Sequence, residues 1–116
     1  MSERYIKIND NNFADFLKSQ YAVLVLGKSD CGNCYEYDKG ISEIVNKPEY
    51  ATVSFGKVVL DEPGSFLFRK NNPWISKLEY LPYLIIYKRG QKVDEFAASN
   101  VRVLEEKLQD NLFQRK

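Results

Sequence analysis

Apolar and polar positions follow two different periods along this chain, and these periods predict its strands and helices. Uninterrupted apolar runs of strand length occupy residues 22–26, 58–60 and 83–87, and residues 5–8 alternate between apolar and polar. Such uninterrupted runs are typical of strands that are buried on both faces. We therefore expect a central sheet that is covered by helices on each side.

Apolar residues also recur at helical spacing between these runs. One stripe follows a polar cluster at residues 9–12, another covers residues 34–44, and a third covers residues 101–112, with Ser99 or Asn100 as its cap. Pro63 opens a further helical stretch, and the turn at residues 88–91 leads to a return strand. The order βαβαβαββα predicts an α/β fold, with a mixed central sheet and helices on both faces, in a single domain over residues 1–116.

Composition limits the kinds of partner and of chemistry. The chain has 116 residues, 44% of them hydrophobic, and a net charge of +1 from 17 basic and 16 acidic residues. The balanced charge does not suit a nucleic-acid partner, and no apolar run is long enough to predict a membrane partner. We expect a cytoplasmic protein, and we expect it to be a monomer. The absence of histidine excludes Cys–His and Ser–His catalysis. It also removes most zinc sites, although a dimer could pool two cysteine pairs into one.

The two cysteines, Cys31 and Cys34, lie where the second apolar run gives way to a helical pattern. Thiols at this spacing can close into a disulfide, and a helix N-terminus stabilises the thiolate of the first cysteine. The apolar stripe contains Cys34, so we expect Cys34 to be buried and Cys31 to be exposed. The pair predicts a redox centre that needs no metal and no organic cofactor.

Over nearly its whole length the chain resembles the thioredoxin family. The resemblance rests on the position of Cys31-x-x-Cys34, on Pro82 at the start of a strand, on the 88–90 hairpin, and on the spacing through Lys57 and Asp61. It implies the thioredoxin fold and a cis Leu81–Pro82 peptide bond, whereas an ordinary trans proline at a strand start is the simpler alternative.

The chain also departs from that family at the cysteine pair. The resemblance leads us to expect tryptophan before the first cysteine, proline between the cysteines, and a buried aspartate six positions before the first one. This chain has Asp30, Asn33 and Val25 at these positions. The family's later helix proline and strand glycine correspond to Lys39 and Ala98. The sequence is therefore that of a divergent member.

The resemblance implies thiol–disulfide exchange in which Cys31 attacks a substrate disulfide and Cys34 then resolves the mixed disulfide. It also implies a substrate groove, to which we assign Asp30, Gly32, Asn33, Leu81 and Pro82, with Ala97 and Ala98 on the other side. Trp74, the only tryptophan, has two interpretations. It either replaces the missing groove tryptophan or covers the sheet as a structural plug.

Removal of a proton from Cys34 is harder to assign. Lys57 stands at the family's lysine position but lacks the buried carboxylate, so we expect it to find another acceptor or to reach solvent. Glu36 and Asp38 follow Cys34 on the predicted helix, and either could relay a proton through water together with Lys57. A solvated helix face is the interpretation that we favour for both.

The sequence thus favours a thioredoxin-like protein disulfide oxidoreductase working in the reductase direction. Its partners would be protein disulfide substrates and a reductase or dithiol donor that recycles it. The main alternative is a binding or adaptor module of the same fold, with weak or no redox activity. A third possibility is an oxidase or isomerase in an oxidising compartment.

Overall fold

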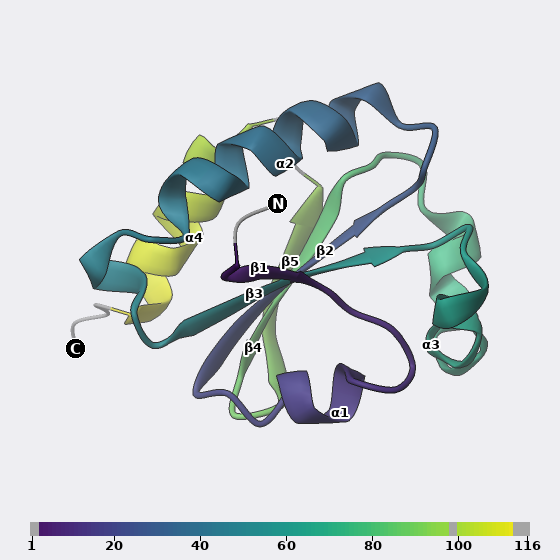
Figure 1. Ribbon diagram of the computed structural model, residues 1–116, viewed down its shortest axis with the longest axis horizontal. Helices are drawn as coiled ribbons and strands as arrows, with labels where there is room; N and C mark the ends of the chain where they lie inside the picture. The colour runs from purple at the N-terminus through teal and green to yellow at the C-terminus, as the bar shows by residue number, and fades with distance from the viewer. Residues whose placement is uncertain (1–2, 98–99, 113–116) are drawn as a thin grey trace.

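A computed structural model describes residues 3–97 and 100–112 of the protein (Figure 1). Its centre is a five-stranded sheet in the order β1-β3-β2-β4-β5. The strands are β1 (Tyr5–Lys7), β2 (Tyr21–Gly27), β3 (Val53–Val59), β4 (Tyr83–Lys88) and β5 (Gln91–Ala97). Strands β1, β3 and β2 are parallel, whereas β4 and β5 are antiparallel to their neighbours. The mixed sheet and the predicted order of elements are confirmed.

Helices cover both faces of this sheet, as Figure 1 shows. Helices α2 (Gly32–Ile44) and α4 (Val101–Leu112) lie on one face, and the short α1 (Phe13–Phe16) and α3 (Phe66–Asn71) lie on the other. Single 3-10 turns occur at Pro48–Tyr50 (η1), Pro63–Ser65 (η2) and Pro73–Lys77 (η3). None of the helices in the described ranges is long and apolar enough to cross a membrane.

A predicted helix cap and a predicted hairpin turn have the expected local geometry. At the start of α4, the side-chain oxygen of Asn100 accepts a hydrogen bond from the backbone N–H of Arg102 at 3.0 Å. The alternative cap, Ser99, lies outside the described residues. Between β4 and β5, Arg89 and Gly90 both have positive φ, 50° and 84°, as a two-residue hairpin requires.

Strand β2 carries the core, since all seven of its residues are buried. Its odd-numbered side chains, such as Val23 and Val25, belong to the cluster under α2 and α4, and its even-numbered ones, such as Leu24, belong to the cluster over α1 and α3. Full burial of one such aliphatic side chain contributes about 1.5–3 kcal/mol. The apolar run at residues 22–26 therefore stabilises both layers at once.

The topology brings three separated segments to one end of the sheet, where β2 and β3 finish and β4 begins. Strands β2 and β3 are parallel, so the end of β2 at Gly27 lies beside Val59 near the end of β3. Strand β4 is antiparallel to β2, so its first residue, Tyr83, pairs with Leu26. Three segments therefore meet at this end of the sheet: the loop that follows β2, the loop that follows β3 and the segment that precedes β4.

At the other end of the sheet, Glu105 ties α4 to η1. Its carboxylate accepts hydrogen bonds from Lys47 Nζ at 2.9 Å and from Tyr50 Oη at 2.8 Å. Partial burial acts to raise the pKa of Glu105, but the hydrogen bonds from Lys47 and Tyr50 outweigh it and hold the pKa below its usual value.

We predict that Glu105→Gln lowers the free energy of unfolding by about 1 kcal/mol at pH 7, because the charge-assisted hydrogen bonds are lost. A lowered carboxyl pKa in the folded state stabilises the protein above the unfolded-state value of about 4.3, and this stabilisation disappears as pH falls through the folded-state pKa. Urea unfolding at pH 7 and pH 3 should therefore show a difference from wild type only at pH 7. Exposed Glu106→Gln is the control, and an equal loss at both pH values would assign the effect to packing.

Candidate active site

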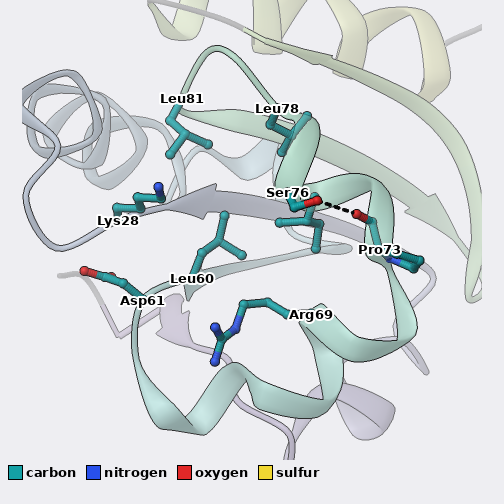
Figure 2. Close-up of a pocket in the computed structure, with 9 residues that line it drawn as sticks. Lys28, Leu60, Asp61, Arg69, Pro73, Ser76, Leu78 and Leu81 are labelled. Atoms are coloured by element: carbon teal, nitrogen blue, oxygen red, sulfur yellow. Dashed lines mark hydrogen bonds between the residues drawn. The ribbon is translucent and has the colours of Figure 1, made fainter.

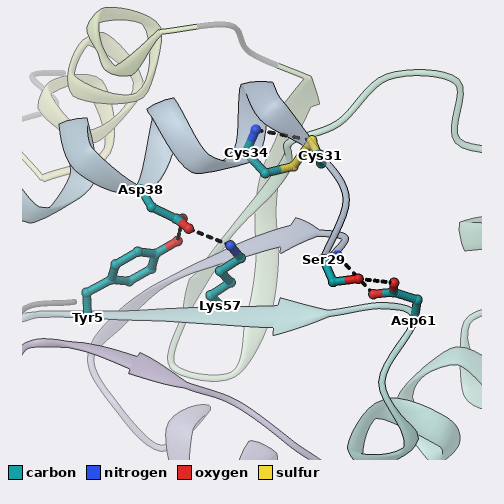
Figure 3. Close-up of a disulfide and its surroundings, with 7 residues drawn as sticks. All are labelled: Tyr5, Ser29, Cys31, Cys34, Asp38, Lys57 and Asp61. Atoms are coloured by element: carbon teal, nitrogen blue, oxygen red, sulfur yellow. Dashed lines mark hydrogen bonds and ion pairs between the residues drawn. A yellow bond between two sulfur atoms is a disulfide. The ribbon is translucent and has the colours of Figure 1, made fainter.

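Cys31 and Cys34 are joined by a disulfide at the start of α2, with their Cα atoms 5.2 Å apart (Figure 3). Cys31 is the N-cap of the helix, and its Sγ accepts a hydrogen bond from the backbone N–H of Cys34 at 3.1 Å. Cys34 is only 1% exposed, whereas Cys31 is half-buried. The burial of Cys34 and the greater exposure of Cys31 agree with the predicted helical stripe.

Gly27, the last residue of β2, allows the helix to approach the sheet at this point. A Cβ atom on Gly27 would lie 3.0 Å from Cys34 Sγ and 3.4 Å from Lys57 Cε, and the first distance is tighter than a normal contact. The sulfur and the lysine side chain therefore face one another across the space that a larger residue would fill. In the sequence, the only signal for this role was a glycine directly after the apolar run at residues 22–26.

Beneath the disulfide, Lys57 on β3 forms an ion pair with Asp38 on α2. The Nζ–Oδ2 distance is 2.5 Å, and both side chains are largely buried, with exposures of 13% and 20%. The solvated helix face that we expected for Asp38 is therefore wrong, because α2 turns this side chain toward the sheet. Glu36, by contrast, is exposed and pairs with Lys39 at 3.6 Å.

Tyr5 completes this cluster, and the sequence analysis did not find it. Its hydroxyl donates a hydrogen bond of 2.7 Å to Asp38 Oδ1, so the two carboxylate oxygens have different donors (Figure 3). Burial, reinforced by the hydrogen bond to Asp38, raises the pKa of Tyr5 far above its usual value. Tyr5 therefore stays protonated and acts only as a donor. Its place on a short alternating strand gave no sign of a polar partner.

Val25 occupies the strand position at which the thioredoxin family was expected to carry aspartate. In the sheet it pairs with Lys57 on β3 and with Leu84 on β4, and it is fully buried. Lys57 thus has an aliphatic neighbour within the sheet and receives its carboxylate from the helix above.

The loop between β2 and α2 is held by Ser29. Its backbone N–H donates to Asp61 Oδ1 at 3.0 Å, and its hydroxyl donates to Asp61 Oδ2. These hydrogen bonds hold the pKa of Asp61 below its usual range. Asp61 follows β3, so this contact connects the segment before Cys31 to the neighbouring strand end. Asp30, next to Cys31, is exposed.

The segment before β4 contains a cis Leu81–Pro82 peptide bond, as the family resemblance implied. Pro82 is buried and Leu81 is half-buried, whereas Gly32 and Asn33 in the first turn of α2 are exposed. Ala97 lies at the end of β5 and pairs with Tyr83. Ala98, the other alanine that we assigned to the groove, lies outside the described residues.

Trp74 makes contacts that favour its structural interpretation. It lies in η3, packs against the cluster over α1 and α3, and places its ring centroid 5.9 Å from that of Tyr83. Lys92 Nζ lies 4.8 Å from the centre of the Trp74 ring, which is cation–π distance. The indole thus covers β4 and reaches toward β5.

Comparisons with known proteins agree with this geometry. A thioredoxin from Ictalurus punctatus is 26% identical over 106 residues, which cover 89% of this chain and 94% of that protein. The solved structure of thioredoxin from Malassezia sympodialis superposes with a TM-score of 0.77 at 17% identity, covering 97% of this chain and 93% of the other. Thioredoxin O2 from Arabidopsis thaliana, solved in its oxidised state, gives 0.74 at 22% identity, covering 95% and 96%. No family model matches the chain.

A five-stranded mixed sheet with flanking helices, a CxxC disulfide at the start of α2 and a cis-proline segment define a protein of the thioredoxin fold. Over most of its length the chain is similar to thioredoxins, at 26% identity to the Ictalurus punctatus protein and with the same fold as the solved structures. Its redox-related cysteine pair is intact, and its differences from the family lie in the residues around that pair.

We predict that, in the reduced protein at neutral pH, iodoacetamide alkylates Cys31 well before Cys34, because Cys31 is the more accessible and lies at the helix N-terminus. Mass spectrometry after timed quenching gives the order. Cys34→Ser should accumulate mixed disulfides with a disulfide substrate, and Cys31→Ser, the matched control, should not. Faster labelling of Cys34 would reverse the two roles.

Proposed function

We propose that this protein is a thiol–disulfide oxidoreductase that reduces protein disulfides through Cys31 and Cys34. The observation that carries the proposal is the unequal pair: Cys31 is the partly exposed N-cap of α2, and Cys34 is its buried disulfide partner. A helix N-terminus favours a thiolate, so Cys31 is suited to attack, while a buried second thiol is protected from solvent and suited to resolution.

The exchange proceeds in two steps. The Cys31 thiolate attacks one sulfur of the substrate disulfide, forms a mixed disulfide and expels the other substrate sulfur as a thiolate. Cys34 then loses its proton and attacks Cys31 Sγ, which closes the Cys31–Cys34 disulfide and releases the second substrate thiolate. Two electrons pass to the substrate. A recycling reductase or dithiol donor returns them to the pair.

The Asp38–Lys57 pair is the proton acceptor that we assign to the second step. Lys57 lies across Gly27 from Cys34 Sγ and bonds to Asp38, which Tyr5 holds from the other side. A proton from Cys34 can pass to this buried cluster without opening the site to bulk water. Asp38 thereby takes the part for which the family resemblance led us to expect a strand aspartate.

Substrate would lie across the exposed end of the site. We assign its binding to the backbone around Leu81 and Pro82, to the Gly32–Asn33 turn beside Cys31, and to Asp30. An extended substrate segment can pair with exposed backbone groups in this way, as in other cases of strand addition. We further infer a reducing compartment such as the cytoplasm, where such a dithiol is kept reduced.

A binding or adaptor module is the alternative. Two aromatic side chains near the cysteine and proline segments favour it, since Tyr35 is 62% exposed and Tyr80 is 72% exposed. Exposed aromatic rings suit a docking surface whether or not the cysteines turn over. The reduction potential and the turnover of the pair discriminate between the two functions.

We predict a reduction potential of roughly −240 to −280 mV, near that of a reducing thioredoxin and well below that of an isomerase. Asn33 supplies no cation beside Cys31 and Asp30 adds a negative charge, so the thiolate is less stabilised and the disulfide more so. Equilibration with graded dithiothreitol or glutathione buffers, followed by alkylation, measures it. A potential above about −180 mV would place the protein among oxidants. Failure to accelerate disulfide reduction by dithiothreitol would favour the binding module.

The proton-acceptor assignment predicts that Asp38→Asn slows resolution of the mixed disulfide about tenfold at pH 7. The loss should be smaller than the 10²–10⁴-fold typical of full acid–base catalysis, because water can substitute in part. Single-turnover reduction of a disulfide substrate measures the step. Glu36→Gln, on the exposed side of α2, is the matched control and should leave the rate unchanged.

A rescue variant tests the same assignment in the opposite direction. Val25 pairs with Lys57 in the sheet, so Val25→Asp can return a carboxylate to Lys57 from below. In the Asp38→Asn background this change should recover part of the lost rate, at some cost in thermal stability because an ionisable group enters the core. A wild-type rate in Asp38→Asn itself would mean that the acceptor is another group.

A further inference from the structure

A cavity of about 490 Å³ opens beside the cis-proline segment, on the side of the sheet that carries α3 (Figure 2). Its volume is within the range of small-ligand sites. The loop after β2, the segment that follows β3, helix α3 and the segment from η3 to β4 all contribute to its lining. The residues that matter for its chemistry are Lys28, Leu60, Asp61, Arg69, Leu78 and Leu81.

The cavity combines an apolar wall with two cations. Leu60, Leu78 and Leu81 supply the wall, and Lys28 and Arg69 supply the positive charges (Figure 2). The carboxylate of Asp61 is engaged on both oxygens by Ser29. Asp61 keeps its negative charge and lies within reach of the charge of Lys28, so two cations face one carboxylate and the lining has a net charge of one positive. It suits a ligand that is partly apolar and negatively charged.

Arg69 is the cation that is available for such a ligand. Its Nε donates a long hydrogen bond of 3.4 Å to the Ser65 carbonyl oxygen. Within residues 3–97 and 100–112, no carboxylate forms an ion pair with its guanidinium. A half-buried guanidinium beside apolar side chains is well suited to bind a carboxylate through two parallel hydrogen bonds.

Two residues that line the cavity also lie close in sequence to the redox centre. Leu81 lines it and also precedes Pro82 in the cis peptide, where the proposed function has the substrate backbone lie. Lys28 lines it and lies three residues before Cys31, in the loop that Ser29 ties to Asp61. A peptide that is disulfide-bonded to Cys31 and passes Leu81 would therefore reach the cavity within a few residues.

We propose that this cavity is a specificity site for the substrate, which binds an apolar side chain and a neighbouring acidic side chain close to the substrate cysteine. The inference rests on the proposed function. The apolar side chain lies against Leu60, Leu78 and Leu81, and the carboxylate bonds to Arg69. Substrates with basic residues at the same place are disfavoured, because they bring a cation to Arg69 and Lys28.

Matched peptide disulfides test this proposal. One peptide carries Leu-Glu two residues from its cysteine, the other carries Leu-Lys, and each is made with the pair before or after the cysteine. We expect the reduced wild-type protein to reduce the better-placed Leu-Glu peptide about tenfold faster than its Leu-Lys counterpart, measured as kcat/KM at low salt. Arg69→Gln should bring this ratio near one, and Arg69→Glu should invert it. The ratio cancels any loss that both peptides share.

Arg102→Glu on exposed α4 is the control, and it should keep the wild-type ratio. A wild-type ratio near one in both registers, or a ratio that Arg69 variants do not change, would overturn the proposal. Calorimetric binding of the same peptides with serine in place of cysteine should show the same preference. Lack of activity on a small neutral disulfide would refute the proposed function instead, and the serine peptides would still decide whether the cavity selects acidic segments.

Discussion

Strand β2 has a hydrogen-bonded neighbour on each side and a layer of helices on each face, and the geometry of the cysteine pair follows from that double burial. A strand held on four sides cannot shift along its neighbours without exposing one of its two apolar sets. Its end at Gly27 is therefore a fixed point, and the loop that leaves it delivers Cys31 to the same place relative to β3 and β4.

The same burial explains the charges beneath the disulfide. A lysine that lies between the sheet and α2 is costly unless a carboxylate meets it. In this chain the strand position beside Lys57 is aliphatic, and the carboxylate comes from Asp38 on the helix. The ion pair therefore joins β3 to α2, and the hydrogen bond from Tyr5 adds β1 to the same cluster. Asp38 thus balances the charge of Lys57, although it lies on α2 and not at the strand position of Val25, where the family resemblance predicted a carboxylate.

Sequence reasoning predicted the order of elements, the burial of Cys34 and the cis Leu81–Pro82 bond. Hydrophobic periodicity reports which residues face the core, and the order of elements and the burial of Cys34 follow from it. The cis bond was predicted from the family resemblance. The same reasoning from periodicity wrongly predicted that Asp38 is exposed to solvent, because a charged residue on an amphipathic helix is usually exposed. The contact with Lys57 depends on how α2 is rotated over the sheet, and no local pattern encodes that rotation.

Tyr5 and the cavity at Arg69 were missed for a related reason. Tyr5 lies on a strand of three residues, too short for its alternation to indicate a partner. The cavity is built from four segments that are up to about fifty residues apart, and its shape depends on how η3 packs over β3 and β4. Local spacing predicts elements, whereas hollows between elements depend on their packing.

Asp38 follows Cys34 by four residues, so the two lie one helical turn apart on the same side of α2. The reacting sulfur and its carboxylate therefore belong to one rigid element. If α2 tilts or slides when a partner docks, both groups move together, and the separation between them is conserved. Only the contact to Lys57 on the sheet changes, which makes the lysine side chain, with its flexible stem, the part that absorbs the movement.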